Sequence, residues 1–127
     1  MLGNTMDGTR LPTIRELVAA LATRDGVEGV VLLGRDGLVI DGRTGSGTDI
    51  EHLAAHVPSL VGAADDLSAR SARGALATAV LEYDHGLAII TTLSSDALLL
   101  VLVHPSANVG SLLLDLRRHR SHIASIV

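Results

Sequence analysis

Apolar residues recur along this chain with two different periods, which predict helices in some segments and strands in others. Helical spacing, with apolar positions three or four residues apart, runs through 12–24, 49–72 and the C-terminal segment 105–127. Shorter runs rich in Val, Ile and Leu, bounded by turn residues, predict strands at 27–34, 37–42, 75–83, 87–93 and 97–104. We therefore expect one domain over 12–127 with the order α-β-β-α-β-β-β-α, preceded by a flexible tail at 1–11.

The first two strands are joined by the stretch "RDG", Arg35 to Gly37, which predicts a tight hairpin because Asp-Gly readily adopts positive φ angles. In the loop that we expect at 43–48, the stretch "GRTGSGT" spaces its glycines like a phosphate-binding loop. Such a loop needs a Lys after its last glycine, however, and Thr48 stands there. The preceding strand also belongs to a hairpin rather than a strand–helix–strand unit, so we interpret 43–48 as an ordinary loop.

The helix predicted at 49–72 has three distinct sides. The side that we expect to face the sheet carries Ile50, Leu53, Val57, Leu60, Val61, Ala64 and Leu67. The roughly opposite side is polar and carries His52, Ser59, Asp66, Arg70 and Arg73. Between them, a small-residue strip of Ala55, Gly62 and Ala69 would let another helix approach closely. Pro58 lies in the middle of this helix and is expected to kink it or to cost about 3 kcal/mol.

The strands differ in how they are expected to be covered. The strand at 97–104 is apolar on both faces, which predicts a central strand buried on both sides. The strand at 75–83 has small residues on one face, which indicates an edge. One twofold axis could pair this edge with its copy and pack the two small-residue strips together. We therefore predict a homodimer whose interface contains Ala55, Gly62, Ala69, Ala77, Ala79, Leu81 and Tyr83.

Composition excludes several function classes. The 127 residues are 47% hydrophobic but 1% aromatic, the net charge is −4, and every basic residue is Arg. Scarce aromatic side chains and an acidic balance argue against binding of nucleic acid or anionic membranes. The chain has no Cys, and its longest apolar run, 97–103, is too short to cross a bilayer. With no apolar N-terminal run typical of a signal peptide, we expect a cytoplasmic protein without a cofactor and without membrane insertion.

The histidines do not form a convincing metal motif. His52 and His56 have the i, i+4 spacing that can chelate a metal, but the metalloprotease motif has Glu after its first His, whereas Glu51 precedes His52. We interpret this pair, and the pair His119 and His122, as surface residues rather than metal ligands.

Catalytic chemistry is equally weakly supported. Glu82 and Asp84, near the end of the edge strand, are more typical of a soluble edge than of an acid–base pair. The chain has no Gly-x-Ser-x-Gly nucleophile elbow. The basic cluster 117–120 is expected to be a solvated face at the helix C-terminus, with docking of an acidic partner as the alternative. We therefore expect a protein that is not an enzyme.

The ordered set of segments resembles the roadblock/dynein-light-chain family over about 13–127. The resemblance lies in "GVEGVVLLGRDGLVIDG" (26–42), a helix beginning "DIEHLAAHVPSL", the strands in "LEYDHGLAIITTLSSDALLLVLV", and the closing "ANVGSLLLDLRR". It implies an α+β, profilin-like fold, with a five-stranded antiparallel sheet in the order 2-1-5-4-3, one helix on one face and two on the other. It also implies homodimers formed by the third strand and the second helix.

The same resemblance implies a function. Bacterial members of the family work with Ras-like small GTPases as activators or scaffolds without catalytic residues of their own, some of them beside a sensor-kinase-like protein. We expect the GTPase to bind the exposed side of the second helix, at His52, His56, Ser59, Asp66, Arg70 and Arg73. Within this function, Arg70 or Arg73 could act as an arginine finger on the GTPase.

The alternative function is a small-molecule-sensing domain of similar α/β layering, which the scarcity of aromatic and buried polar residues disfavours.

Overall fold

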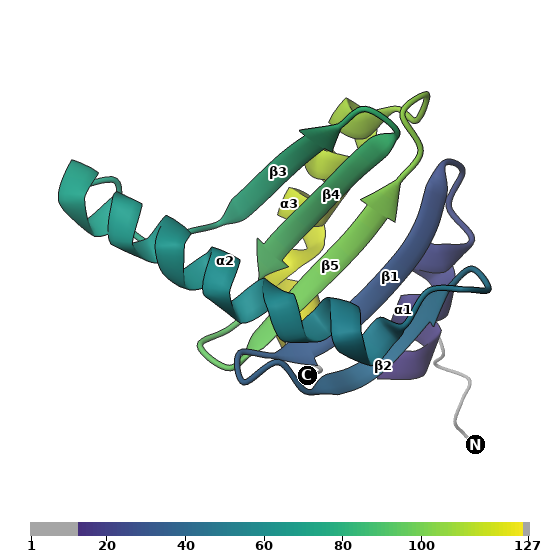
Figure 1. Ribbon diagram of the computed structural model, residues 1–127, viewed down its shortest axis with the longest axis horizontal. Coiled ribbons are helices and arrows are strands. Elements are labelled where there is room, and N and C mark those ends of the chain that lie inside the picture. The colour runs from purple at the N-terminus through teal and green to yellow at the C-terminus, as the bar shows by residue number, and fades with distance from the viewer. Residues whose placement is uncertain (1–12, 126–127) are drawn as a thin grey trace, which may run out of the picture.

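The computed structural model describes residues 13–125, apart from the side chains of His119, His122, Ile123 and Ala124. Within these residues the chain forms three helices and one five-stranded antiparallel sheet in the order β2-β1-β5-β4-β3 (Figure 1). The elements are α1 (Ile14–Ala22), β1 (Val27–Gly34), β2 (Val39–Thr44), α2 (Ile50–Ser71), β3 (Thr78–Tyr83), β4 (Gly86–Thr92), β5 (Ala97–Val103) and α3 (Val109–Ala124). The predicted element and strand orders are confirmed, and the predicted tail at 1–11 lies outside the described residues.

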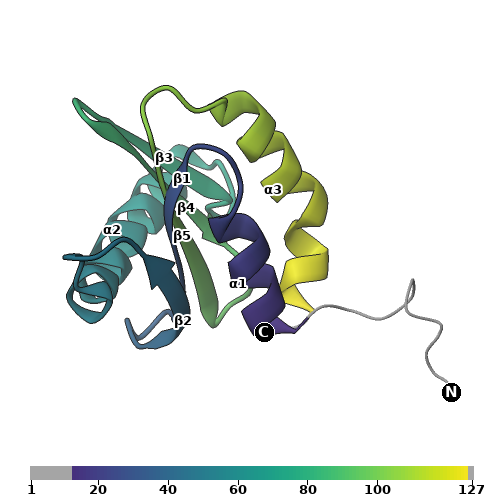
Figure 2. The same ribbon diagram turned by 90° about the vertical axis from the view of Figure 1, so that its right-hand side faces the viewer.

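Each face of the sheet buries its own core. Figure 2 shows α1 and α3 on one face and α2 on the other. Val18, Leu112 and Leu116 pack on the first face, whereas Ala54, Val57 and Val61 pack on the second. β5 contributes Leu99 and Val101 to the first core and Leu98 and Leu100 to the second, which confirms that it is central and covered on both faces. Each fully buried Leu or Val contributes roughly 1.5–3 kcal/mol, so the apolar residues on both faces hold the layers together.

Polar side chains fix where the helices begin. The Thr13 Oγ1 accepts from the Glu16 backbone N at 3.1 Å, and the Glu16 Oε1 accepts from the Thr13 backbone N at 2.9 Å, forming a capping box. α1 therefore starts at Ile14, and it ends two residues before the predicted end at 24; Pro12 lies outside the described residues. Asn108 caps α3 by accepting from the Ser111 backbone N at 3.0 Å.

The connection between β1 and β2 is longer than predicted. It runs from Arg35 to Leu38, and of its central residues Gly37 has a positive φ, +88°, whereas Asp36 does not. The Asp36 carboxylate instead accepts from the Leu38 backbone N at 3.0 Å. Ile40 is then left over as a bulge, because Leu33 pairs with Val39 and Leu32 with Asp41. The predicted hairpin is confirmed, but the predicted strand bounds of 37–42 are wrong: β2 starts at Val39 and continues to Thr44, and the loop starts at Gly45.

α2 is continuous through Pro58 but leaves the sheet halfway along its length. Its buried residues end at Val61, and the rest of the helix extends past the sheet beyond the start of β3 (Figure 1). The prediction that Leu67 faces the sheet is therefore wrong, since its side chain is 69% exposed, and Ala64 is only half-buried. Pro58 lies against the β1–β2 turn, where a Cβ added at Gly37 would be 3.4 Å from the Pro58 Cγ.

The start of β3 is held by the end of β4. The Thr92 backbone N donates to the Ala77 carbonyl at 3.0 Å, and the Thr92 Oγ1 donates to the Leu76 carbonyl at 2.6 Å. Arg120 of α3 donates from Nε to the Thr92 carbonyl at 2.7 Å and from Nη2 to Thr92 Oγ1 at 2.9 Å. The prediction of a solvated basic cluster at 117–120 is therefore wrong for Arg120, because its long side chain reaches the sheet.

Candidate functional site

An apolar groove of about 300 Å³ lies between α2 and the sheet on the side of β3. Its lining is Leu53, His56, Val57, Leu60, Leu81, Tyr83, Ala88, Ile90, Leu100 and Leu102. Leu67 follows Leu53 and Leu60 at the same seven-residue spacing, so it carries the apolar side of α2 beyond the end of the sheet. Tyr83 and Leu67 are 61% and 69% exposed, respectively. Together they extend the groove into an exposed apolar surface.

The edge strand β3 adjoins this groove. β3 pairs with β4 on one side and has no pairing strand on the other within the described residues. Ala79 and Leu81 pack on the α2 side of the sheet, where Tyr83 lines the groove. Ala77 lies one residue before the strand, and its carbonyl accepts from Thr92. The structure thus places the predicted interface residues 79, 81 and 83 on the α2 side of the edge strand, where Leu81 and Tyr83 line the groove.

The small-residue strip lies on a different side of α2. A Cβ added at Gly37 in the β1–β2 turn would be 3.6 Å from the Ala55 Cα, so Ala55 faces that turn and not β3. Gly62 and Ala69 follow at seven-residue spacing and are exposed, and a Cβ added at Gly62 would meet nothing within 4 Å. Asp65, which lies between Gly62 and Ala69 in the sequence, also points to the β1–β2 turn, because its Oδ2 lies 3.3 Å from the Arg35 Nη1. The strip and the β3 edge are therefore separated by the width of the helix.

The predicted GTPase-binding residues line the outer side of α2. His52 and His56 are exposed and adjacent, with Nε2 atoms 3.4 Å apart, and Ser59 follows on the next turn. Arg70 donates from Nε to the Asp66 Oδ2 at 3.2 Å, in a largely exposed pair that contributes at most about 1 kcal/mol. Arg73 comes after the end of the helix, where Ala72 has a φ of 56°. The outer side is therefore polar, solvated and available for contact.

Sequence reasoning missed the groove because it assigned Leu53, Leu60 and Leu67 to the buried face. The signal was present, since these leucines are offset by about one position from Ala54 and Val61, which are the residues that the sheet buries. Helical periodicity identifies an apolar side but does not show how much of it the sheet covers.

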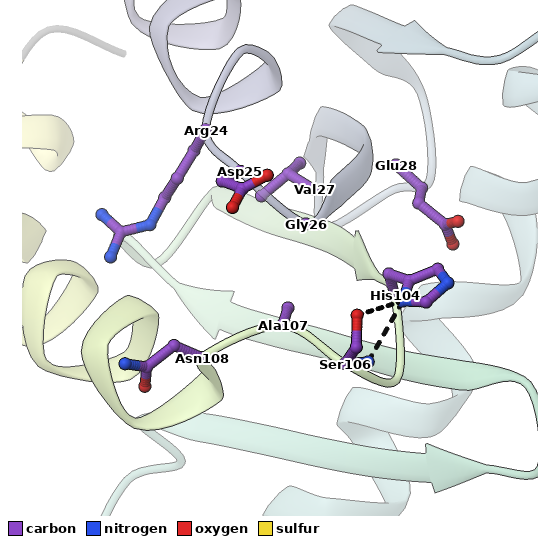
Figure 3. A pocket seen from close by; sticks show the side chains of 9 residues that line it. All are labelled: Arg24, Asp25, Gly26, Val27, Glu28, His104, Ser106, Ala107 and Asn108. Carbon is purple, nitrogen blue, oxygen red and sulfur yellow. Dashed lines mark hydrogen bonds between the residues drawn. The ribbon is translucent and has the colours of Figure 1, made fainter.

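A second hollow, of about 680 Å³, lies between the α1–β1 and β5–α3 loops (Figure 3). Several of its polar groups already have local partners. Arg24 pairs with Asp115 and donates to the Ser111 Oγ at 2.8 Å, and the His104 Nδ1 lies 2.7 Å from the Ser106 Oγ. In Figure 3 the side chains of Arg24 and Asn108 point away from those of Glu28 and His104. The hollow therefore has the volume of a ligand site without a convergent set of polar groups.

The described part of residues 13–125 lacks two further features, a cluster of metal-binding side chains and a membrane-spanning helix. In this part of the chain, three or more His, Asp or Glu side chains are nowhere gathered as a metal site would require. Likewise, none of the helices described here has the length and apolar character needed to cross a membrane.

This chain is similar in sequence to a known domain family and to known proteins. The model of the Roadblock/LC7 domain matches residues 13–103. An uncharacterized protein of Methanocaldococcus jannaschii is 26% identical over 113 residues, which cover 89% of this chain and 98% of that protein.

Two solved structures share the fold. A Roadblock/LC7 domain from Streptomyces avermitilis is 24% identical with a TM-score of 0.78, covering 88% of this chain and 95% of that chain. A structure of MglB with a tetrameric arrangement is 19% identical with a TM-score of 0.77, covering 88% of this chain and 85% of that chain. Since the family model spans α1, α2 and all five strands, this chain belongs to the Roadblock/LC7 family.

Proposed function

We propose that this chain is a cytoplasmic, homodimeric adaptor that binds a Ras-like small GTPase and modulates its nucleotide cycle without catalytic residues of its own. The match to the Roadblock/LC7 domain carries the proposal, because resemblance to this family implies a partner of this class. A sensor-kinase-like protein is a further partner that the resemblance implies.

The features around β3 support self-association. An unpaired edge strand presents free backbone N–H and C=O groups, which pair readily with a second strand. The adjacent groove leaves apolar lining exposed, and Leu67 extends that surface beyond the sheet. A second copy related by a twofold axis would cover both features at once. The tetrameric arrangement of MglB, which has the same fold, is consistent with self-association of this chain.

We therefore assign the dimer interface to Ala79, Leu81 and Tyr83 of β3, together with Leu53, Leu60 and Leu67 of α2. The sequence-based interface also included Ala77 and the small-residue strip of Ala55, Gly62 and Ala69. Ala55 of that strip faces the β1–β2 turn. The strip would stay accessible in this dimer.

The outer side of α2 is the surface that we assign to the GTPase: His52, His56, Ser59, Asp66, Arg70 and Arg73. It is exposed in the described chain, and apart from His56, which also lines the groove, it would remain exposed when the groove side of α2 is covered. The mechanism would be positional. A rigid dimer that binds one nucleotide state of the GTPase more tightly than the other shifts its equilibrium by that difference in affinity.

The test is charge reversal at the outer side of α2. We expect the double variant Arg70→Glu/Arg73→Glu to abolish co-purification of a Ras-like GTPase from the same genome, loaded with GDP or a non-hydrolysable GTP analogue. Size-exclusion chromatography with light scattering should show an unchanged dimer. The matched control is Arg117→Glu/Arg118→Glu, which reverses two exposed charges on α3 and should leave co-purification intact.

Two results would contradict the proposal. Undiminished binding by the α2 double variant would remove the GTPase from this surface. Failure of the unaltered protein to retain any of the GTPases in either nucleotide state would remove the function itself.

A small-molecule-sensing function is the alternative, and the volume of the hollow between the α1–β1 and β5–α3 loops favours it. The local engagement of Arg24, His104 and Asn108 argues against it, because a ligand would have to compete for groups that already cap α3 or form turns.

A further inference from the structure

The two histidines at the start of α2 converge on one point in space. His52 and His56 are one helical turn apart, their rings lie edge to face with centroids 5.0 Å apart, and their Nε2 atoms are separated by 3.4 Å. Both side chains are exposed, so a solvated ion can reach them. The separation has a chemical meaning: two nitrogens bound to Zn²⁺ at about 2.0–2.1 Å with a tetrahedral angle lie roughly 3.3–3.4 Å apart.

The sequence alone favours surface residues here, but from this geometry we propose that His52 and His56 form a two-ligand half-site for a divalent transition-metal ion of the Zn²⁺ class. The backbone of α2 fixes the separation of the two rings, so little further ordering is needed on binding. α2 is capped at this end by Asp49, whose Oδ1 accepts from the His52 backbone N at 3.2 Å. His52 therefore lies in a capped first turn, and His56 lies one turn further along the helix, away from its end.

Binding requires a defined protonation state of both rings. In the metal-free contact one Nε2 donates to the other, so one ring carries its proton on Nε2. With metal bound, both Nε2 atoms would act as ligands, so the donor ring's proton would move to its Nδ1, while the accepting ring already carries its proton there. Because both rings are exposed, water can accept from each Nδ1–H.

The charge environment permits a cation here. The N-terminus of a helix has a partial positive charge, which disfavours a metal ion on its first turn. Two carboxylates, Asp49 and Glu51, belong to this same turn and offset that charge. Within the described residues, however, no third His, Asp or Glu joins the pair to complete a closed site. The remaining coordination positions would be filled by water or by a side chain of a docked protein.

The site extends the proposed function without depending on it. It lies on the outer side of α2, and His56 also lines the groove beside Tyr83, so an ion there would add positive charge where both assigned surfaces meet. Metal binding by the isolated chain can be measured without any GTPase. Failure of one proposal therefore leaves the other untouched.

The experiment is calorimetric titration of the protein, without an affinity tag, with ZnCl₂ near neutral pH. We expect saturable binding of one ion per chain, or one per two chains if two half-sites share it, and a rise in Tm on adding Zn²⁺. His52→Ala and His56→Ala should each weaken binding at least about tenfold, since loss of even an outer partner of a metal ligand costs about 10–100-fold.

Two controls make the result specific. His85→Ala removes a histidine of the β3–β4 turn and should change nothing, and His119→Ala/His122→Ala removes the other closely spaced pair. Retained binding in both single α2 variants, or its loss only in the His119/His122 variant, would overturn the assignment to α2. Absence of saturable Zn²⁺ binding by the unaltered protein would overturn the proposal itself.

Discussion

The two halves of α2 have the same helical periodicity but opposite environments. The first half, up to Val61, buries Ala54, Val57 and Val61 against the sheet and is backed by the β1–β2 turn at Pro58. The second half, from Gly62 to Ser71, buries no residue and exposes Leu67. The comparison shows that one apolar side of a helix can be buried along only part of its length. The first half anchors α2 to the sheet, and the second half leaves Leu67 exposed in the surface that we propose a second copy covers.

The largest difference should appear when a charge is placed in each half. Val61→Asp puts an unpaired carboxylate into the apolar core beneath α2 and should lower the free energy of unfolding by about 3 kcal/mol or more. Ala63→Asp, two residues later and exposed, should change it by no more than about 0.7 kcal/mol through helix propensity. Urea unfolding followed by circular dichroism measures both. Equal losses would show that the second half is packed as tightly as the first.

Replacing a glycine by alanine should change the stability of the protein in opposite directions at Gly37 and at Gly62. Gly37 has a φ of +88° and lies against Pro58, so Gly37→Ala should destabilise the protein by roughly 1–2 kcal/mol. Gly62 is helical and faces open space, so Gly62→Ala should stabilise by roughly 0.5–1 kcal/mol. Thermal unfolding of the two variants side by side tests this. Destabilisation by Gly62→Ala would mean that a neighbour needs close access to the helix there.

Substitution of Leu67 should have the smallest effect on the stability of one chain. It should also reveal the most about how two chains assemble. Leu67→Asp removes an exposed side chain and should change the free energy of unfolding of the monomer by no more than about 0.5 kcal/mol. It should nevertheless shift the light-scattering mass towards the monomer, because it charges the proposed dimer interface. Leu38→Asp is the matched control, since Leu38 is also 69% exposed but lies in the β1–β2 turn. If Leu38→Asp disrupts the dimer and Leu67→Asp does not, the interface lies at the other edge of the sheet.

Sequence patterns predicted the element order because each element carries a local signal. Strand β5 was identified as central from its apolar residues alone, and it does contribute to both cores. The hairpin was identified, but the bounds of its connection at 35–38 were not, because Asp-Gly favours several turns, and the bulge at Ile40 depends on pairing with β1. Arg120 was also misplaced, since its partner Thr92 lies 28 residues away in sequence.

For the candidate surfaces, the sequence identified the helix and the strand but not their relative placement. It determined by itself that one helix carries apolar, small and polar sides and that 75–83 forms an edge. The tertiary structure decided which of those sides borders the edge, because the direction in which α2 crosses the sheet depends on the packing of Val57 and Val61 and on the seating of Pro58 against Gly37. It also decided that Leu67 is exposed, since a helix buries its apolar side only as far as the sheet beneath it extends.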